Sequence, residues 1–144
     1  MTTLLLLCAF ALSTPQPTAP DGTAMAKITQ VIHDFSTAVD QQDVKETDAV
    51  LHAEFRAVVN QFMGAADVTI LSKSMYLEML KSKKIGGDQR KVKVHSIHLT
   101  DNVAVAHVTF TGEKLAFHTF IQLVEDTEKN WSIVSDMPNV AARQ

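Results

Sequence analysis

The chain has 144 residues, of which 46% are hydrophobic, and a formal net charge of −3. This length suits one domain with a substantial core, and the mixed charge excludes disordered, collagen-like and nucleic-acid-coating proteins. A single cysteine, Cys8, excludes a disulfide within the chain. No uninterrupted apolar span reaches roughly 18 residues, so we predict no membrane-spanning helix in the mature protein.

The first 22 residues differ from the rest of the chain. Leu4–Leu12 (LLLLCAFAL) is a short apolar run, and the polar, proline-bearing stretch Ser13–Gly22 follows it. Such a run has the length of the hydrophobic region of a secretory signal. We therefore predict that residues 1–22 are an export signal with a linker, and that the domain at residues 23–144 is secreted or periplasmic. Because no Lys or Arg precedes the run, a cytoplasmic protein with an N-terminal tail is the alternative.

Helical periodicity begins after this segment. Apolar residues recur at steps of three and four between Thr23 and Gln42, which predicts one amphipathic helix that buries a single face. Asp43, with Glu46 three residues later, has the pattern of a capping box and predicts a second, shorter helix. The apolar residues of the first helix are Met25, Ile28, Val31, Ile32, Phe35, Ala38 and Val39.

The middle of the chain carries strand signals and one more helix. Glu54–Phe62 alternates with a period of two and predicts a strand, and Val68–Leu71 is a short extended piece. Ser72 is a candidate N-cap for a third helix, and the glycine pair at residues 86–87 is typical of a helix end. The apolar residues of this helix are Met75, Tyr76, Met79 and Leu80.

A basic run follows the third helix. Six of the 13 Lys and Arg residues lie between Lys81 and Lys93. Such a strip could meet an anionic ligand, but it also occurs where a helix ends and an edge strand begins, because lysines block unwanted strand pairing. We favour the second interpretation. No aromatic residue is interleaved with the run, which argues against binding of single-stranded nucleic acid.

The last part of the chain predicts a meander of strands around a central hairpin. Gly112 fits the first position of a two-residue type II′ turn, because glycine adopts positive φ without a steric clash. This turn would place His107 opposite His118, with Phe110 and Phe117 facing the helices. The four predicted strands lie at residues 90–99, 103–111, 115–123 and 130–135.

The order of these elements predicts an α+β fold, with helices on one face of a mostly antiparallel sheet. Five segments carry recognisable motifs, and the most specific of them contains Ile85-Gly86-Gly87-Asp88 followed by Arg90. The five segments are Leu51–Arg56, Tyr76–Leu80, Ile85–Arg90, Phe117–Leu123 and Trp131–Val134.

Together these segments resemble the nuclear transport factor 2-like superfamily (SnoaL-like, cystatin-like fold), and within it the putative lumazine-binding family. The resemblance covers about residues 25–135. It implies a cone-shaped, bent sheet packed on three N-terminal helices, and a pterin-like ligand. The superfamily hosts isomerases, cyclases, dehydratases and non-catalytic binders, so this fold alone does not decide the function.

Two positions depart from that resemblance. Where the family tends to carry Asp and Tyr, this chain has Thr119 and Phe120. Asp136 stands where a lysine is common. If the polarity of the family's pocket depends on these positions, this chain has lost part of it.

Six residues are candidates for lining a pocket between the sheet and the helices. A largely apolar cleft suits a small aromatic or apolar ligand, and a filled core without a cavity is the alternative. Tyr76 is the only tyrosine and a candidate proton donor, but no carboxylate occupies a predicted inward position beside it. We therefore predict no catalytic residue and no cofactor. The six candidates are Asn60, Phe62, Tyr76, Phe110, Phe117 and Thr119.

The opposite face of the sheet is the predicted homodimer interface. As opposed residues, His107 and His118 would have Cβ atoms roughly 5 Å apart and could share a proton or a metal ion, with Ser96 or His98 joining them. Zinc usually needs three or four ligands, and no carboxylate or cysteine belongs to this face, so we predict interface histidines and no metal. The predicted interface residues are Val94, Ser96, Val105, His107, His118 and Phe120.

Three functions stay open at this point. The one we favour is a non-catalytic homodimer that binds a small organic molecule, with no nucleic acid and no stable membrane insertion. The second is an isomerase- or cyclase-like enzyme. The third is a structural dimerisation module with a closed core.

Overall fold

The computed structural model describes residues 22–143, and the expected export signal around Leu4–Leu12, with Cys8, lies outside them. The described chain forms three α-helices, one short 3-10 helix and six strands. None of these helices is long and apolar enough to cross a membrane. The elements are α1 (Gly22–Asp40), α2 (Val44–Val50), β1 (Leu51–Asn60), η1 (Phe62–Gly64), β2 (Val68–Ser72), α3 (Lys73–Lys81), β3 (Lys91–Thr100), β4 (Val103–Thr111), β5 (Leu115–Glu125) and β6 (Trp131–Ala142).

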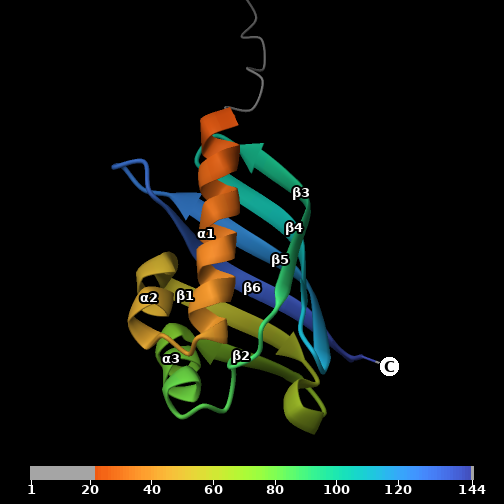
Figure 1. The fold of residues 1–144 in the computed structure, drawn as a ribbon. Coiled ribbons are helices and arrows are strands. Elements are labelled where there is room, and N and C mark those ends of the chain that lie inside the picture. The colour runs from red at the N-terminus through yellow and green to blue at the C-terminus, as the bar shows by residue number, and fades with distance from the viewer. Residues whose placement is uncertain (1–21, 144) are drawn as a thin grey trace, which may run out of the picture.

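The six strands form one sheet with the order β2-β1-β6-β5-β4-β3. β3 to β6 are a consecutive antiparallel meander, and β1 pairs with β6 in parallel. Figure 1 shows α1 crossing the sheet on one side, with α2 and α3 on that same side near one end. The predicted α+β fold, a bent and mostly antiparallel sheet packed on three N-terminal helices, is therefore confirmed.

The helices form where the periodicity and the capping residues predict them. In α1 the residues at helical spacing are buried against the sheet, because they supply its only continuous apolar face. The Asp43 carboxylate accepts a hydrogen bond from the Glu46 backbone N–H (3.0 Å) and starts α2. The Ser72 hydroxyl accepts from the Met75 N–H (3.3 Å) and starts α3. The buried apolar residues of α1 are Ile28, Ile32, Phe35, Ala38 and Val39.

The strand ends differ from the predicted ones. β1 ends at Asn60, so Phe62 lies in η1 rather than in the strand. β6 runs on to Ala142, well past the predicted end at residue 135. Alternation did not indicate this extension because Pro138 interrupts it. A proline is tolerated there because β6 pairs with β1 only as far as Asp136, so no neighbour on that side needs its missing N–H.

The turn between β4 and β5 is not the predicted type II′ turn. β4 ends at Thr111 and β5 begins at Leu115, so the loop has three residues rather than two. Gly112 does not adopt a positive φ. It is needed for a close approach instead, because a Cβ atom there would overlap the Asp88 carboxylate. That carboxylate accepts a hydrogen bond from the Glu113 N–H (3.1 Å) and holds the turn.

The longer loop shifts the pairing of β4 with β5 by two residues. His107 lies opposite Phe120 rather than opposite His118, so the predicted histidine pair is wrong. A shift of two residues keeps both faces of each strand, because side chains alternate with a period of two. Phe110 and Phe117 therefore still lie on the inner face, where they pair with each other.

A second irregularity lies in β3. The pairing with β4 is displaced between Val94 and Ser96, so His95 is the extra residue of a bulge. The bulge reverses the alternation, so that His95 and Ser96 are both on the outer side while Val94 packs against the core. The prediction that Val94 lies on the outer face is therefore wrong.

Candidate functional site: a cavity between sheet and helices

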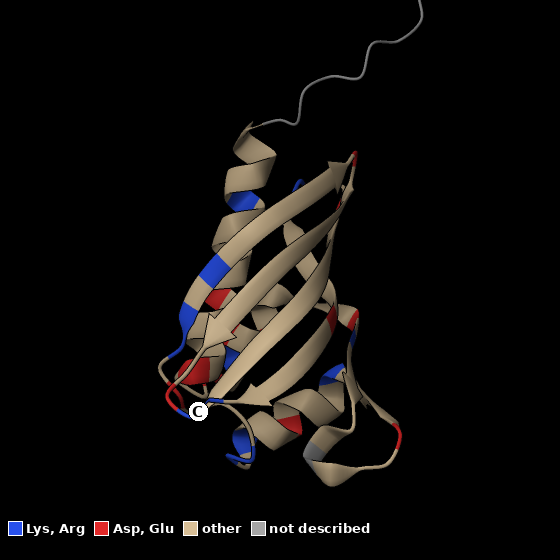
Figure 2. Cartoon of the chain, turned by 90° about the vertical axis from the view of Figure 1, so that its right-hand side faces the viewer, with Lys and Arg blue, Asp and Glu red and all other residues tan. Residues whose placement is uncertain are grey.

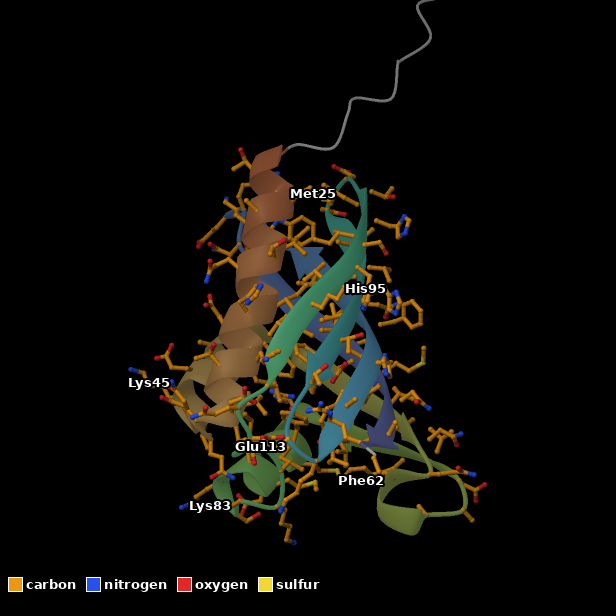
Figure 3. The ribbon with its side chains drawn as sticks, turned by 45° about the vertical axis from the view of Figure 1, so that its right-hand side comes forward. Met25, Lys45, Phe62, Lys83, His95 and Glu113 are labelled. Carbon is orange, nitrogen blue, oxygen red and sulfur yellow. The ribbon has the colours of Figure 1, made fainter. Side chains whose placement is uncertain are left out.

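A cavity of about 850 Å³ lies between the inner face of the sheet, the C-terminal half of α1, and α3 with the loop that follows it. All six residues predicted to line a pocket contribute to its wall. Figure 3 shows Phe62 and Glu113 toward the same end of the molecule, whereas Met25 lies at the opposite end. The cavity thus occupies the end where η1, the β4–β5 turn and the segment after α3 meet. The six are Asn60, Phe62, Tyr76, Phe110, Phe117 and Thr119.

The cavity reaches the outer face of the sheet through a gap between two strands. The pairing of β1 with β6 ends at Ala57 and Asp136, and the two strands separate beyond that pair. Outward-facing residues of both strands therefore line the opening together with inward-facing ones. The outward-facing residues around the opening come from these two strands and from their neighbours: Val58 and Asn60 on β1, Val68 on β2, His118 and Phe120 on β5, and Met137 and Asn139 on β6.

Asp136 is a buried carboxyl group in the cavity wall. Its side chain is on the inner face of β6, and the residue is 8% exposed. The hydroxyl of Thr119, itself fully buried on β5, donates a hydrogen bond to Asp136 Oδ1 (2.5 Å). Burial raises the pKa of Asp136 to about 6, although the Thr119 hydrogen bond and the charge of Arg90 oppose the increase. A carboxyl group with this pKa exchanges a proton near neutral pH.

Tyr76 brings a hydroxyl group to the same cavity. Its ring packs edge-on against Phe55 (5.4 Å between centroids) and at a tilt against Phe35 (6.2 Å). The residue is 9% exposed, and burial together with the charge of Asp136 raises the pKa of its hydroxyl. The phenol therefore stays protonated, and among residues 22–143 its oxygen has no hydrogen-bond partner.

Arg90 completes the polar part of the wall. Its Nε donates to Asp40 Oδ1 (2.5 Å), its backbone N–H donates to Asp40 Oδ2 (2.9 Å), and one terminal nitrogen donates to the Ser36 carbonyl (3.2 Å). The guanidinium lies over the rings of Phe110 (5.0 Å) and Phe117 (5.6 Å), which is cation–π geometry. The Arg90–Asp40 ion pair connects the end of α1 with the segment before β3 and fixes one side of the cavity.

Sequence reasoning missed Asp136 as an inward residue. Trp131 and Ile133 are buried, so strict alternation would turn residue 135 inward and residue 136 outward. The pairing of β6 with β5 is displaced around Val134, and this bulge inverts the alternation for the rest of the strand. The only available signal was the departure from the family pattern at this position. The prediction that no carboxylate faces inward near Tyr76 is therefore wrong.

The outer face of the sheet carries a histidine and phenylalanine cluster. The ring of His107 stacks between His95 (4.6 Å) and Phe120 (5.0 Å). The Thr109 hydroxyl lies 2.8 Å from His95 Nε2 and 3.2 Å from His118 Nδ1, so it connects two of the imidazoles. Desolvation of the His95 ring, together with the nearby His107, Lys93 and His118 side chains, lowers the pKa of His95. Among the described residues, no group of three potential ligands is placed to hold a metal ion.

Comparison with known proteins identifies the fold. A family model described as putative lumazine-binding matches residues 23–137. A nuclear transport factor 2-like protein of unknown function from Silicibacter pomeroyi has a TM-score of 0.72 at 16% identity, over 83% of this chain and 97% of that one. One from Shewanella baltica gives 0.73 at 12% identity, over 86% and 98%. A cystatin-like protein of unknown function from Nostoc punctiforme gives 0.66 at 11% identity, over 84% and 93%. No curated protein matches the chain.

Proposed function

The chain belongs to the putative lumazine-binding family, and from the cavity we propose that it is a non-catalytic, homodimeric binder of a small aromatic or apolar molecule. The observation that carries this proposal is a cavity of about 850 Å³ with a mostly apolar wall and a few polar groups. Cavities of roughly 300–1,000 Å³ with such walls are typical of small-molecule sites. A structural module with a closed core would leave no such volume.

Ligand binding is tested with a panel of lumazines, pterins, flavins and simple aromatic compounds, measured by thermal shift and by titration calorimetry. We expect at least one class to raise the melting temperature in a concentration-dependent way. Ala57→Phe would fill the cavity from β1 and abolish this rise. Ala53→Phe, at an exposed position of the same strand outside the cavity, controls for the addition of a phenyl ring to β1 and should bind like the wild type. If no compound binds, or if Ala57→Phe binds as well as the control, the proposal is wrong.

The dimer would use the outer face of the sheet. Figure 2 shows that the broad strands of this face carry few charged residues, and that basic residues lie along one edge strand. Phe120 and Met137 pair with each other there and are 48% and 51% exposed. Exposed apolar side chains on a nearly uncharged face favour contact with a second copy. Because both residues also line the opening of the cavity, such a partner would cover that opening.

Light scattering tests the dimer directly. Phe120→Ser should yield a monomer with an unchanged circular dichroism spectrum. Met75→Ser, which changes an equally exposed residue on α3, should remain a dimer. A wild-type protein that is monomeric at micromolar concentration would refute this part of the proposal.

A second candidate function is proton transfer on a bound carbonyl compound. It is favoured by one pair of groups: Asp136, whose pKa is raised to about 6, and the protonated hydroxyl of Tyr76 in the same cavity. A base of this pKa and a neutral hydrogen-bond donor are the groups that isomerisation needs. Incubation of bound ketones in D₂O, followed by NMR, would show deuterium incorporation that Asp136→Asn abolishes. Absence of incorporation for every ligand that binds would leave the non-catalytic function.

A further inference from the structure

One row of side chains crosses the outer face of the sheet. Strand pairing places Ile70 of β2 opposite Val58 of β1, and Met137 of β6 opposite Phe120 of β5. Val58 and Met137 each come directly after the last paired residue between β1 and β6, so the row continues across that gap. Ile70, Met137 and Phe120 are all exposed. The β2 end of this row is therefore apolar and accessible.

The other end of the row consists of imidazole rings. His107 of β4 lies opposite Phe120 and stacks between it and His95 of the β3 bulge. His118 joins them through the Thr109 hydroxyl, which lies within hydrogen-bond distance of both His95 and His118. Figure 3 labels His95 on the side of the sheet away from α1. These three rings, which we call the histidine cluster, occupy one end of a face that is apolar at the other.

The Thr109 hydroxyl limits how many of these rings can be protonated at once. A hydroxyl donates one hydrogen bond, so it pairs fully with two imidazoles only when one of them presents an acceptor nitrogen. A protonated imidazole presents none, because both of its nitrogens then donate. With His95 and His118 both protonated, the hydroxyl hydrogen would lose its acceptor, and two positive charges would meet at one oxygen. The arrangement therefore favours at least one neutral ring.

The charged groups beside the cluster on β3 are cations. Lys91 and Lys93 lie on the outer face before the bulge, and His98 lies on that face after it. Desolvation of its ring, followed by the nearby His107 and Lys93 side chains, lowers the pKa of His95. Positive charge on any of these neighbours raises the cost of protonating the cluster.

Carboxylates do not offset this positive charge. β3 and β4 contain no Asp or Glu. Glu125, at the end of β5, is paired with Lys129, and Asp136 of β6 is buried on the inner face. The carboxylates of α1 lie across the sheet, because this helix packs on the inner side (Figure 1). Among residues 22–143, no carboxylate forms an ion pair with the three rings.

We propose that the histidine cluster makes the association of two copies depend on pH, so that the dimer forms when the rings are neutral and separates when they are protonated. This inference rests on the proposed dimer and names its regulation. In a two-fold contact through this face, the cluster of one copy would meet either the apolar end of the partner's row or the partner's own cluster. The first contact would desolvate a protonated ring, and the second would bring like charges together. Both disfavour the protonated form, so acid weakens the dimer in either arrangement.

The sign of the effect follows from linkage. Imidazoles ordinarily titrate at a pKa of about 6.5. A ring that must stay neutral in the dimer gives full affinity above this pH, and the affinity falls as the pH drops below it. Sedimentation velocity over a concentration series measures the dissociation constant of the dimer at pH 7.5 and at pH 5.5. We expect it to rise at least tenfold, the factor that one such ring gives over this interval. An unchanged circular dichroism spectrum at pH 5.5 would show that the copies separate without unfolding.

A variant without titratable rings in the cluster gives the specific result. In His95→Gln/His107→Phe/His118→Gln, each amide can still pair with the Thr109 hydroxyl, and the phenyl ring can still stack on Phe120. This variant should dimerise at pH 7.5 and have the same dissociation constant at pH 5.5. His107→Phe alone should dimerise at pH 7.5 with a smaller rise than the wild type. His33→Gln, an exposed histidine of α1, is the control and should show the full rise.

The outcomes separate the pH dependence from the dimer. A wild-type dissociation constant that is equal at the two pH values would overturn the role of the cluster and leave the dimer standing. The role would also be wrong if the triple variant or His107→Phe showed the full wild-type rise, because other groups would then cause it. A protein that is monomeric at both pH values would refute the dimer and this inference together.

Discussion

The burial of Asp136 predicts a measurable dependence of stability on pH. Its pKa is about 6 in the folded protein, against 3.8 for an unperturbed aspartate. The folded state therefore binds this proton more tightly than the unfolded state does. By linkage, the contribution of Asp136 to stability falls as pH rises from about 4 to about 6, and stays lower above that range. A shift of roughly two pKa units corresponds to about 3 kcal/mol.

Asp136→Asn removes this ionisation while keeping the size of the side chain. From pH 4 to pH 8, we expect the free energy of unfolding of the variant to rise by about 3 kcal/mol relative to that of the wild type. The reason is that only the wild type must hold a buried charge at the higher pH. Urea unfolding at a series of pH values measures the difference. The single tryptophan, Trp131, is 6% exposed in the folded state and serves as the fluorescence reporter.

A contrasting variant controls for general effects of removing a carboxylate. Hydrogen bonds from the backbone N–H groups of Asn130 and Glu128 lower the pKa of Asp126, the opposite direction. Asp126→Asn should therefore lose stability at neutral pH, and its deficit should shrink as the pH falls through the acid range. A difference between Asp136→Asn and the wild type that stays constant across pH would refute the assignment of a buried, high-pKa carboxyl group.

Two further variants test local structure by urea unfolding. Gly112→Ala should lower the free energy of unfolding by about 2 kcal/mol, because the new Cβ atom overlaps the carboxylate of Asp88 and breaks its hydrogen bond with the Glu113 N–H. Gly22→Ala, where nothing lies within 4 Å, should change stability little, and equal effects of the two variants would contradict the close approach. Ser72→Ala should cost about 1 kcal/mol through loss of the N-cap of α3, whereas Ser72→Thr should retain most of the stability; a neutral alanine variant would show that the cap does not stabilise the helix.

The regular part of the fold could be predicted because local signals and tertiary packing agree. The apolar spacing of α1 and the caps at Asp43 and Ser72 are local features, and each determines its helix start without reference to distant residues. The two faces of the central hairpin were also predicted. The prediction of the two faces is correct although the predicted turn type is not, because a register error of two residues leaves each side chain on the same face of its strand.

The polar part of the site could not be predicted, because the alternation of polar and apolar residues along a strand does not show where a bulge occurs. One bulge moved His95 to the outer face, and another turned Asp136 inward. Each bulge depends on the neighbouring strand, so a single strand's sequence does not locate it. Arg90 was missed for a similar reason: its role follows from contact with Asp40, fifty positions away in the chain.

The wall of the cavity is assembled from nearly the full length of the domain, from Phe35 in α1 to Val140 in β6. A molecule held there would touch the first helix and the last strand at once and act as a noncovalent cross-link between them. Occupancy would then protect both ends of the domain from fraying, and an endoprotease would cleave the empty protein at either end before the filled one.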